Sequence, residues 1–165
     1  MSRNLLTEIF LLSEEVISAG LEKGITVATA ESCTGGLIGA AITATPGSSA
    51  VFHGGIISYH NSVKITQLAV EQSALDDHGA VSEIVAMQMA QGCRERLNVD
   101  IAVSVTGVAG PGGGSVEKPV GTVWMGLATG NDVSAKLHNF PNLSRNKVRD
   151  HTCLAALETL LKCMN

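Results

Sequence analysis

A serine that stands directly before a glycine turn is the first candidate for chemistry. The run AESCTGG (30–36) follows a short β-rich segment and precedes LIGAAIT, an order typical of a strand, a tight turn and a helix. Backbone N–H groups and the positive end of the helix dipole at such a turn can hold an oxyanion or a phosphate. The turn therefore suits a nucleophilic Ser32, although Ser32 or Thr34 could simply cap the helix.

A lysine near the start of another predicted helix is the second candidate. We expect Asn61 to be the N-cap of a helix over residues 62–70, which places Lys64 at its third position. The positive helix end lowers the pKa of a lysine there, and a neutral lysine can act as a general base. No Ser-His-Asp order is apparent, so a Ser32–Lys64 pair would supply the base that Ser32 needs. Without that partner Lys64 is an ordinary surface lysine.

The third candidate is the glycine-rich loop from Thr106 to Ser115, which holds five glycines in ten residues. It contains neither a Walker A motif nor the dinucleotide fingerprint G-x-G-x-x-G. Its place directly after a predicted strand favours close approach of the backbone to a ligand, with a flexible connection as the alternative.

Other reactive side chains give weaker signals. Cys33 lies at a helix N-terminus, where a thiol can be nucleophilic, but a small buried residue is the simpler interpretation. The five histidines show no metal-ligand spacing, and the four cysteines form no C-x-x-C pair. Arg145, Lys147 and Arg149 open the last predicted helix; we expect solvated side chains, with Arg145 able to reach an anionic ligand.

The apolar pattern predicts the elements that position these residues. The predicted helices are 3–22, 37–43, 62–70, 82–97 and 144–163, the predicted strands are 25–29, 51–59, 100–105, 120–128 and 133–140, and residues 71–81 are predicted to be irregular. This order predicts an α/β fold, a three-layer α/β/α arrangement with a mixed β-sheet. We expect residues 1–165 to form a single domain.

Composition excludes several classes of function. The chain has 165 residues, a formal net charge of -4 and only 3% aromatic residues, so neither a basic stripe nor a base-stacking platform for nucleic acid is expected. No apolar run is long enough to span a membrane, and the N-terminus lacks a signal peptide. We therefore expect a cytoplasmic protein with no nucleic-acid or membrane partner.

Four segments together resemble the CinA C-terminal domain family: AESCTGG (30–36), GGIISYHNSVK (54–64), GAVS (79–82) and TGVAGPGGGSVEKPVGTVW (106–124). The resemblance covers nearly the whole chain, and the chain looks like a stand-alone member of the family. It implies a nicotinamide-nucleotide amidohydrolase, or NMN deamidase, that converts nicotinamide mononucleotide and water to nicotinate mononucleotide and ammonia. No metal or other cofactor is implied, the partner is a pyridine nucleotide, and a homodimer is expected.

The resemblance also implies roles for individual residues. The family's proposed Ser–Lys dyad falls on Ser32 and Lys64, and Tyr59 would orient Lys64 or share in proton transfer. The implied substrate-binding residues are Glu31, Cys33, Thr34, Gly35, Gly36, Asn61, Thr106, Gly107, Ala109, Gly110 and Arg145.

One segment departs from the family pattern. The family usually has a phenylalanine and then a Gly-Asp-Arg run before the last helix, whereas this chain has FPNLSR (140–145), with the arginine displaced by one position. This departure leaves open a catalytically inactive paralogue that binds a pyridine nucleotide without turnover. Amide hydrolysis with Cys33 as the nucleophile is a third possibility.

Overall fold

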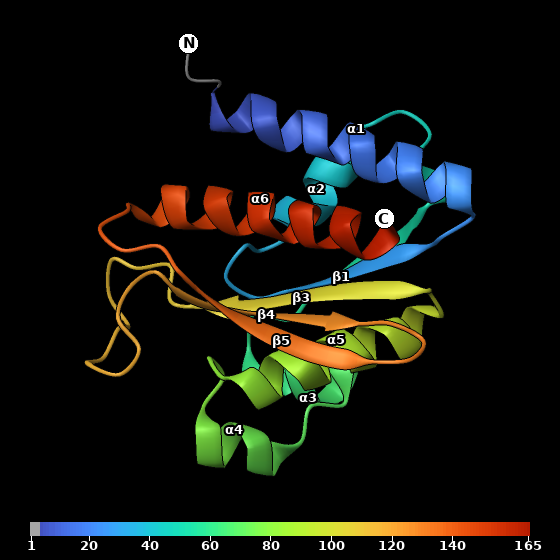
Figure 1. Ribbon diagram of the computed structural model, residues 1–165. Helices are drawn as coiled ribbons and strands as arrows, with labels where there is room; N and C mark the ends of the chain where they lie inside the picture. Colours follow the sequence, from blue (N-terminus) through green and yellow to red (C-terminus); the bar gives the residue numbers. More distant parts are fainter. Residues whose placement is uncertain (1–3) are drawn as a thin grey trace.

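A five-stranded mixed sheet forms the middle layer of the computed structural model, which describes residues 4–165 (Figure 1). The strands are β1 (Val27–Glu31), β2 (Phe52–Ile57), β3 (Ile101–Gly107), β4 (Thr122–Ala128) and β5 (Val133–Asn139). Their order across the sheet is β2-β1-β3-β4-β5. β1 is parallel to β2 and β3, whereas β4 and β5 continue the sheet as an antiparallel hairpin.

Helices cover both faces of this sheet. The helices are α1 (Leu5–Lys23), α2 (Leu37–Thr43), α3 (Asn61–Leu68), α4 (Gln72–His78), α5 (Glu83–Leu97) and α6 (Arg145–Met164), with a 3-10 turn at Ser48–Ala50. Figure 1 shows α1, α2 and α6 on one side and α3, α4 and α5 on the other. Each side has its own apolar cluster, one around Ile38, Val103 and Leu157 and the other around Leu68 and Met89. The predicted α/β/α arrangement is confirmed.

The connections out of β1 and β2 leave the sheet on opposite faces. β1 continues into α2, whereas β2 continues into α3 on the other side (Figure 1). Where two adjacent parallel strands diverge in this way, their carboxyl ends border a crevice, the usual ligand position in open α/β sheets. Ser32 follows β1, and the segment from Tyr59 to Lys64 follows β2, so the fold brings both candidates to this crevice.

Two helix predictions were wrong. Residues 71–81 are not irregular throughout, because Gln72–His78 forms α4 and buries Ala74 and Leu75 in the apolar cluster that contains α5 residues. Asn61 is not the N-cap of α3, because the His60 side chain accepts the Ser62 N–H (3.2 Å) and Asn61 is already helical.

The strand and helix limits also shifted. β1 begins at Val27 rather than residue 25, since the Ile25 amide bonds back to the end of α1 and the Thr26 amide bonds the Asp100 carboxylate. β2 ends at Ile57 rather than residue 59. The first described residue of the helix predicted from residue 3 is Leu5, preceded by Asn4 as N-cap; residue 3 lies outside the described residues. Within residues 4–165, no helix is long and apolar enough to cross a membrane.

Candidate active site

Ser32 is held at the carboxyl end of β1 by its own backbone. Its amide donates to the carbonyl of Val105 on β3 (3.0 Å), and the next residues turn sharply into α2. Gly35 and Gly36 both adopt positive φ angles, 61° and 97°, which residues with a Cβ rarely adopt. This pair of glycines lets α2 begin after a turn of only five residues, with Ser32 as the first residue of the turn.

The buried carboxylate of Glu31 caps α2. It accepts hydrogen bonds from the hydroxyls of Thr29 and Thr34 and from the amides of Gly36, Ile38 and Gly39, at 2.7 to 3.2 Å. A negative charge at a helix N-terminus is stabilised by the dipole and satisfies amides that have no intrahelical acceptor. Neither Ser32 nor Thr34 is the cap. Glu31, expected to bind substrate, instead holds the turn from beneath, because only 1% of it is exposed.

Lys64 is buried beside Ser32. Its Nζ lies 3.2 Å from Ser32 Oγ, 2.7 Å from the Ser58 carbonyl oxygen and 3.4 Å from the Tyr59 carbonyl oxygen. A neutral amine has two N–H donors and one lone pair, so two carbonyl acceptors leave the lone pair for the Ser32 hydroxyl. The lysine is the fourth residue of α3, not the third. Burial lowers its pKa, which favours this neutral form.

A polar pocket of about 200 Å³ opens over this pair. Its lining residues are Ser32, Cys33, Tyr59, Asn61, Lys64, Ala80, Val81, Thr106, Gly107, Ala109 and Arg145. Ala80 and Val81 were not predicted, although both lie in the GAVS segment; the Thr106 hydroxyl donates to the Ala80 carbonyl (2.8 Å) and so fixes that segment to β3.

Five residues that the resemblance implied as binding residues do not line this pocket. They are Glu31, Thr34, Gly35, Gly36 and Gly110. The first four shape the turn behind Ser32, and Gly110 acts at the mouth through its carbonyl. Gly107 does line the pocket, and its missing side chain matters, because a Cβ there would lie 2.7 Å from the Thr122 carbonyl oxygen.

Arg145 and Tyr59 meet at the mouth of the pocket. The Arg145 guanidinium donates to the Gly110 carbonyl (2.7 Å) and to the Tyr59 hydroxyl (3.0 Å). The Tyr59 hydroxyl thus contacts Arg145, whereas it is the Tyr59 backbone carbonyl that contacts Lys64. The altered FPNLSR segment turns at Asn142, whose φ of 59° is tolerated by asparagine, and still delivers Arg145 to the mouth.

Cys33 is a poor nucleophile in this environment. Only 6% of it is exposed, and burial raises the pKa of its thiol to about 12. The thiolate is the reactive form, and it is scarce at neutral pH when the pKa is that high. Ser32 is therefore the better candidate for nucleophile at this turn.

The backbone amides of the nucleophile turn, residues 32–36, differ in whether another residue accepts from them. The Gly35 amide donates to the Ser32 carbonyl (3.1 Å), and the Gly36 amide donates to Glu31. The amides of Cys33 and Thr34 donate to no other residue among residues 4–165. Cys33 lines the pocket and Thr34 does not, so the Cys33 N–H is the candidate donor to an oxyanion that forms next to Ser32.

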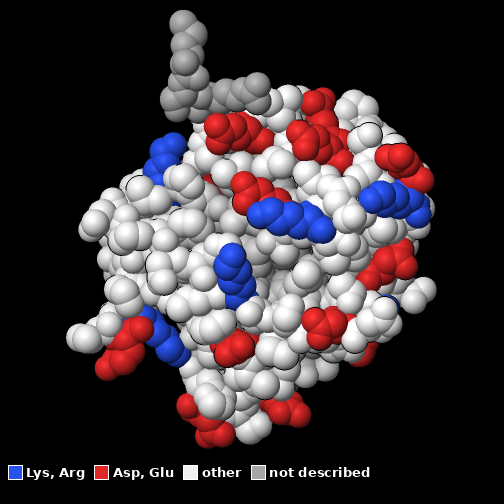
Figure 2. All heavy atoms as spheres, viewed as in Figure 1, with Lys and Arg blue, Asp and Glu red and all other residues white. Residues whose placement is uncertain are grey.

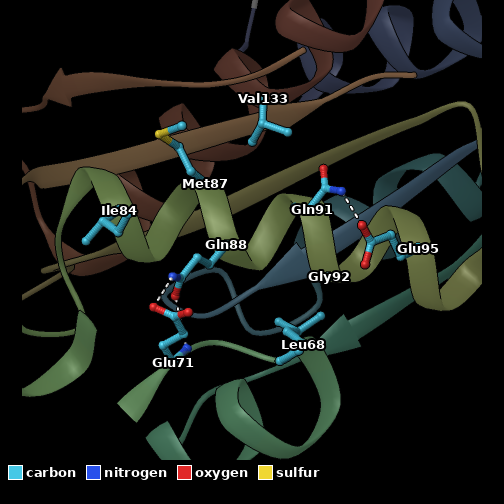
Figure 3. Close-up of a pocket in the computed structure, with 10 residues that line it drawn as sticks. Leu68, Glu71, Ile84, Met87, Gln88, Gln91, Gly92, Glu95 and Val133 are labelled. Atoms are coloured by element: carbon cyan, nitrogen blue, oxygen red, sulfur yellow. Dashed lines mark hydrogen bonds between the residues drawn. The ribbon is translucent and has the colours of Figure 1, made fainter. Parts of the chain in front are cut away.

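A larger hollow, about 340 Å³, lies along α5 but offers less chemistry (Figure 3). Its polar side chains are already paired, Gln88 with Glu71 and Gln91 with Glu95.

Acidic and basic side chains are interspersed on the face that Figure 2 shows. Within the described residues, no three His, Cys, Asp or Glu side chains are grouped so as to hold a metal ion. The pocket over Ser32 is the candidate active site.

Comparison with known proteins points to the same family as the sequence motifs. The model of the CinA C-terminal domain matches residues 10–164. A CinA-like protein of Chlorobaculum tepidum is 54% identical over 118 residues, 72% of this chain and 28% of the relative. A CinA-like protein of Leptospira borgpetersenii is 48% identical over 153 residues, 90% of this chain and 36% of the relative. The chain thus spans only about a third of the length of these relatives.

Solved structures share the fold closely. A competence/damage inducible protein from Agrobacterium tumefaciens superposes with a TM-score of 0.92 and 42% identity, covering 94% of both chains. A competence-damaged protein (CinA) superfamily protein from Escherichia coli gives a TM-score of 0.90 at 30% identity, covering 95% of this chain and 91% of that one.

Proposed function

The chain belongs to the CinA C-terminal domain family, and from this premise we propose that it is an amidohydrolase that converts nicotinamide mononucleotide to nicotinate mononucleotide and ammonia. Ser32 is the nucleophile and Lys64 its general base. The observation that carries the proposal is the 3.2 Å contact between Ser32 Oγ and a buried Lys64 Nζ at a polar pocket. A lysine with a lowered pKa next to a serine is the pairing that serine activation requires.

The first chemical step transfers the Ser32 proton to neutral Lys64 while Oγ attacks the carboxamide carbon of the substrate. The two carbonyls that accept from Nζ, those of Ser58 and Tyr59, keep the amine in place and direct its lone pair to the hydroxyl. They also stabilise the ammonium that forms on proton transfer, because both are hydrogen-bond acceptors.

The tetrahedral intermediate carries its negative charge on the former carboxamide oxygen. The Cys33 amide holds this oxygen, since Cys33 lines the pocket and its N–H donates to no other residue in the described chain. Lys64 then gives its proton to the departing nitrogen, which leaves as ammonia, and Ser32 remains esterified with the nicotinoyl group. A water molecule activated by Lys64 hydrolyses this ester and restores both residues.

The size and polarity of the pocket suit one end of a nucleotide. Its volume of about 200 Å³ is below the ~300–1,000 Å³ of pockets that enclose a drug-sized ligand. We infer that the pocket takes the nicotinamide ring and that the phosphate lies outside, at Arg145. Two of the five guanidinium N–H donors are used by Gly110 and Tyr59, so three remain for phosphate oxygens.

The test measures ammonia release from nicotinamide mononucleotide by the purified chain. We expect turnover in the unmodified protein and its loss in Ser32→Ala and Lys64→Met, with Ser134→Ala, an exposed serine on β5, as the matched control. Full activity of Ser32→Ala would refute the role of Ser32. Calorimetry on the same samples distinguishes an enzyme from a binding module, because a binding module would bind nicotinamide mononucleotide without releasing ammonia.

A further inference from the structure

Arg149, on the C-terminal helix α6, contacts the nucleophile turn, residues 32–36. It lies one helical turn after Arg145 on α6, and its Nη2 donates to the Thr34 carbonyl (2.8 Å). The sequence predicted a solvated side chain, but Arg149 is half-buried and its Nη2 lies 4.0 Å from the position that a Cβ on Gly35 would take. It does not line the pocket, so it acts on the site only through the turn.

The contact begins a row of aligned peptide groups. In a trans peptide, the C=O and N–H groups point in opposite directions. Arg149 donates to the carbonyl of the Thr34–Gly35 peptide, whose N–H, that of Gly35, donates to the Ser32 carbonyl (3.1 Å). The Ser32–Cys33 peptide therefore directs its own N–H, that of Cys33, away from Gly35.

This row ends at the amide assigned above to the oxyanion. The Cys33 N–H donates to no other residue in residues 4–165, and Cys33 lines the pocket. Hydrogen bonds in series polarise one another, and a cationic donor at the start of the row strengthens the effect. The positive charge of Arg149 thus lies at one end of two aligned peptide dipoles, with the reacting oxygen at the other.

We propose that Arg149 is a positioning residue that orients and polarises the Cys33 amide through the Thr34 and Ser32 carbonyls. This inference rests on the proposed nucleophile turn. Loss of a direct oxyanion-hole donor lowers kcat by about 10²–10³-fold. Arg149 acts through two peptide groups, so its loss is expected to lower kcat by roughly 10-fold and to leave KM nearly unchanged, because it does not touch the bound substrate.

The experiment compares Arg149→Met with Lys147→Met, an exposed cation on the same helix with no hydrogen bond in the described chain. We expect kcat to fall only in Arg149→Met, partial recovery in Arg149→Lys, and recovery of Arg149→Met when millimolar guanidinium is added. A structural role alone would lower both kcat and the unfolding temperature without rescue by guanidinium. Equal kcat in the two Met variants, with unchanged KM, would overturn the proposal.

A second readout separates this inference from the choice of substrate. Acylation of the protein by p-nitrophenyl acetate, followed as mass gained at Ser32, needs the nucleophile and the oxyanion-binding Cys33 amide but no nucleotide. Ser32→Ala serves as the blank. If the unmodified chain is acylated but releases no ammonia, the proposed function fails while a slower Arg149→Met acylation still supports this role. Acylation as fast in Arg149→Met as in Lys147→Met, or none in the unmodified chain, overturns it.

Discussion

Replacing Glu31 by glutamine tests how the nucleophile turn is held together. The change keeps the shape of the side chain but removes its charge and turns one acceptor oxygen into an NH₂ donor. Of the two carboxylate oxygens, Oε2 accepts from three donors and Oε1 from the Gly39 amide and the Thr29 hydroxyl. The best arrangement of a glutamine keeps its oxygen at Oε2 and places nitrogen against the Gly39 N–H.

The cost follows from what that arrangement loses. The Thr29 hydroxyl can rotate and accept, but the Gly39 amide (2.8 Å from Oε1) loses its acceptor. A buried donor without an acceptor costs about 1–3 kcal/mol. Losing the charge at the α2 N-terminus costs about a further 1 kcal/mol, within the range for dipole effects. We expect Glu31→Gln to lower the free energy of unfolding by roughly 2–4 kcal/mol.

Denaturation followed by circular dichroism measures this loss. At about 2–4 °C per kcal/mol for a chain of this size, the midpoint should fall by roughly 5–15 °C. The matched control is Glu83→Gln, which removes an exposed carboxylate in the first turn of α5 and should cost no more than about 1 kcal/mol. Equal loss of stability in the two variants would refute the assignment of Glu31 as the buried cap.

Three further predictions concern the pH profile, the turn and the cysteines. Because burial lowers the pKa of Lys64 from its ordinary value of 10.5 and the neutral amine is the base, kcat/KM should rise with pH and level off well below pH 10.5; a plateau reached only near pH 10.5 would contradict a lowered pKa. Gly36→Ala should lose about 1–2 kcal/mol of unfolding free energy in denaturant titrations, because φ is 97° and the new Cβ would lie 3.0 Å from Ile57, whereas Gly112→Ala, in open space, should change stability little. Iodoacetamide at pH 8 should modify Cys163 first by intact mass, since the other three cysteines are buried, and early modification of any of those three would contradict their burial.

Local patterns predicted most of the elements but not all of their boundaries. The apolar spacing of α1 and the two β-rich runs on either side of residues 130–132 are strong signals, and α1, β4 and β5 were all predicted. α4 was missed because Gln72–His78 is polar apart from Ala74 and Leu75, and only packing against the rest of the α5 face favours a helix there. The start of α3 depended on which of two adjacent residues, His60 or Asn61, caps the helix, and the His60 side chain accepts the Ser62 N–H.

The functional residues likewise divide into those that sequence motifs predict and those that only the tertiary structure reveals. Sequence motifs pointed to Ser32, Lys64 and Arg145 as members of one site, and the fold brings all three to one pocket. No local rule predicts that Glu31 caps α2, because glutamate is not a favoured N-cap and α2 begins six residues after it, whereas an N-cap directly precedes its helix. The Arg149 contact joins residues 115 positions apart and has no local signal at all.

The sequence by itself determined the residue types available for chemistry, the α/β order of the elements and the places where glycine permits a sharp turn. These are local properties, because they follow from side-chain chemistry, hydrophobic periodicity and allowed backbone angles. Only the tertiary structure decided that Lys64 is buried and that the Arg149 charge meets the nucleophile turn. Burial and long-range hydrogen bonds depend on which surfaces the parallel strands bring together, and that is a property of the whole sheet.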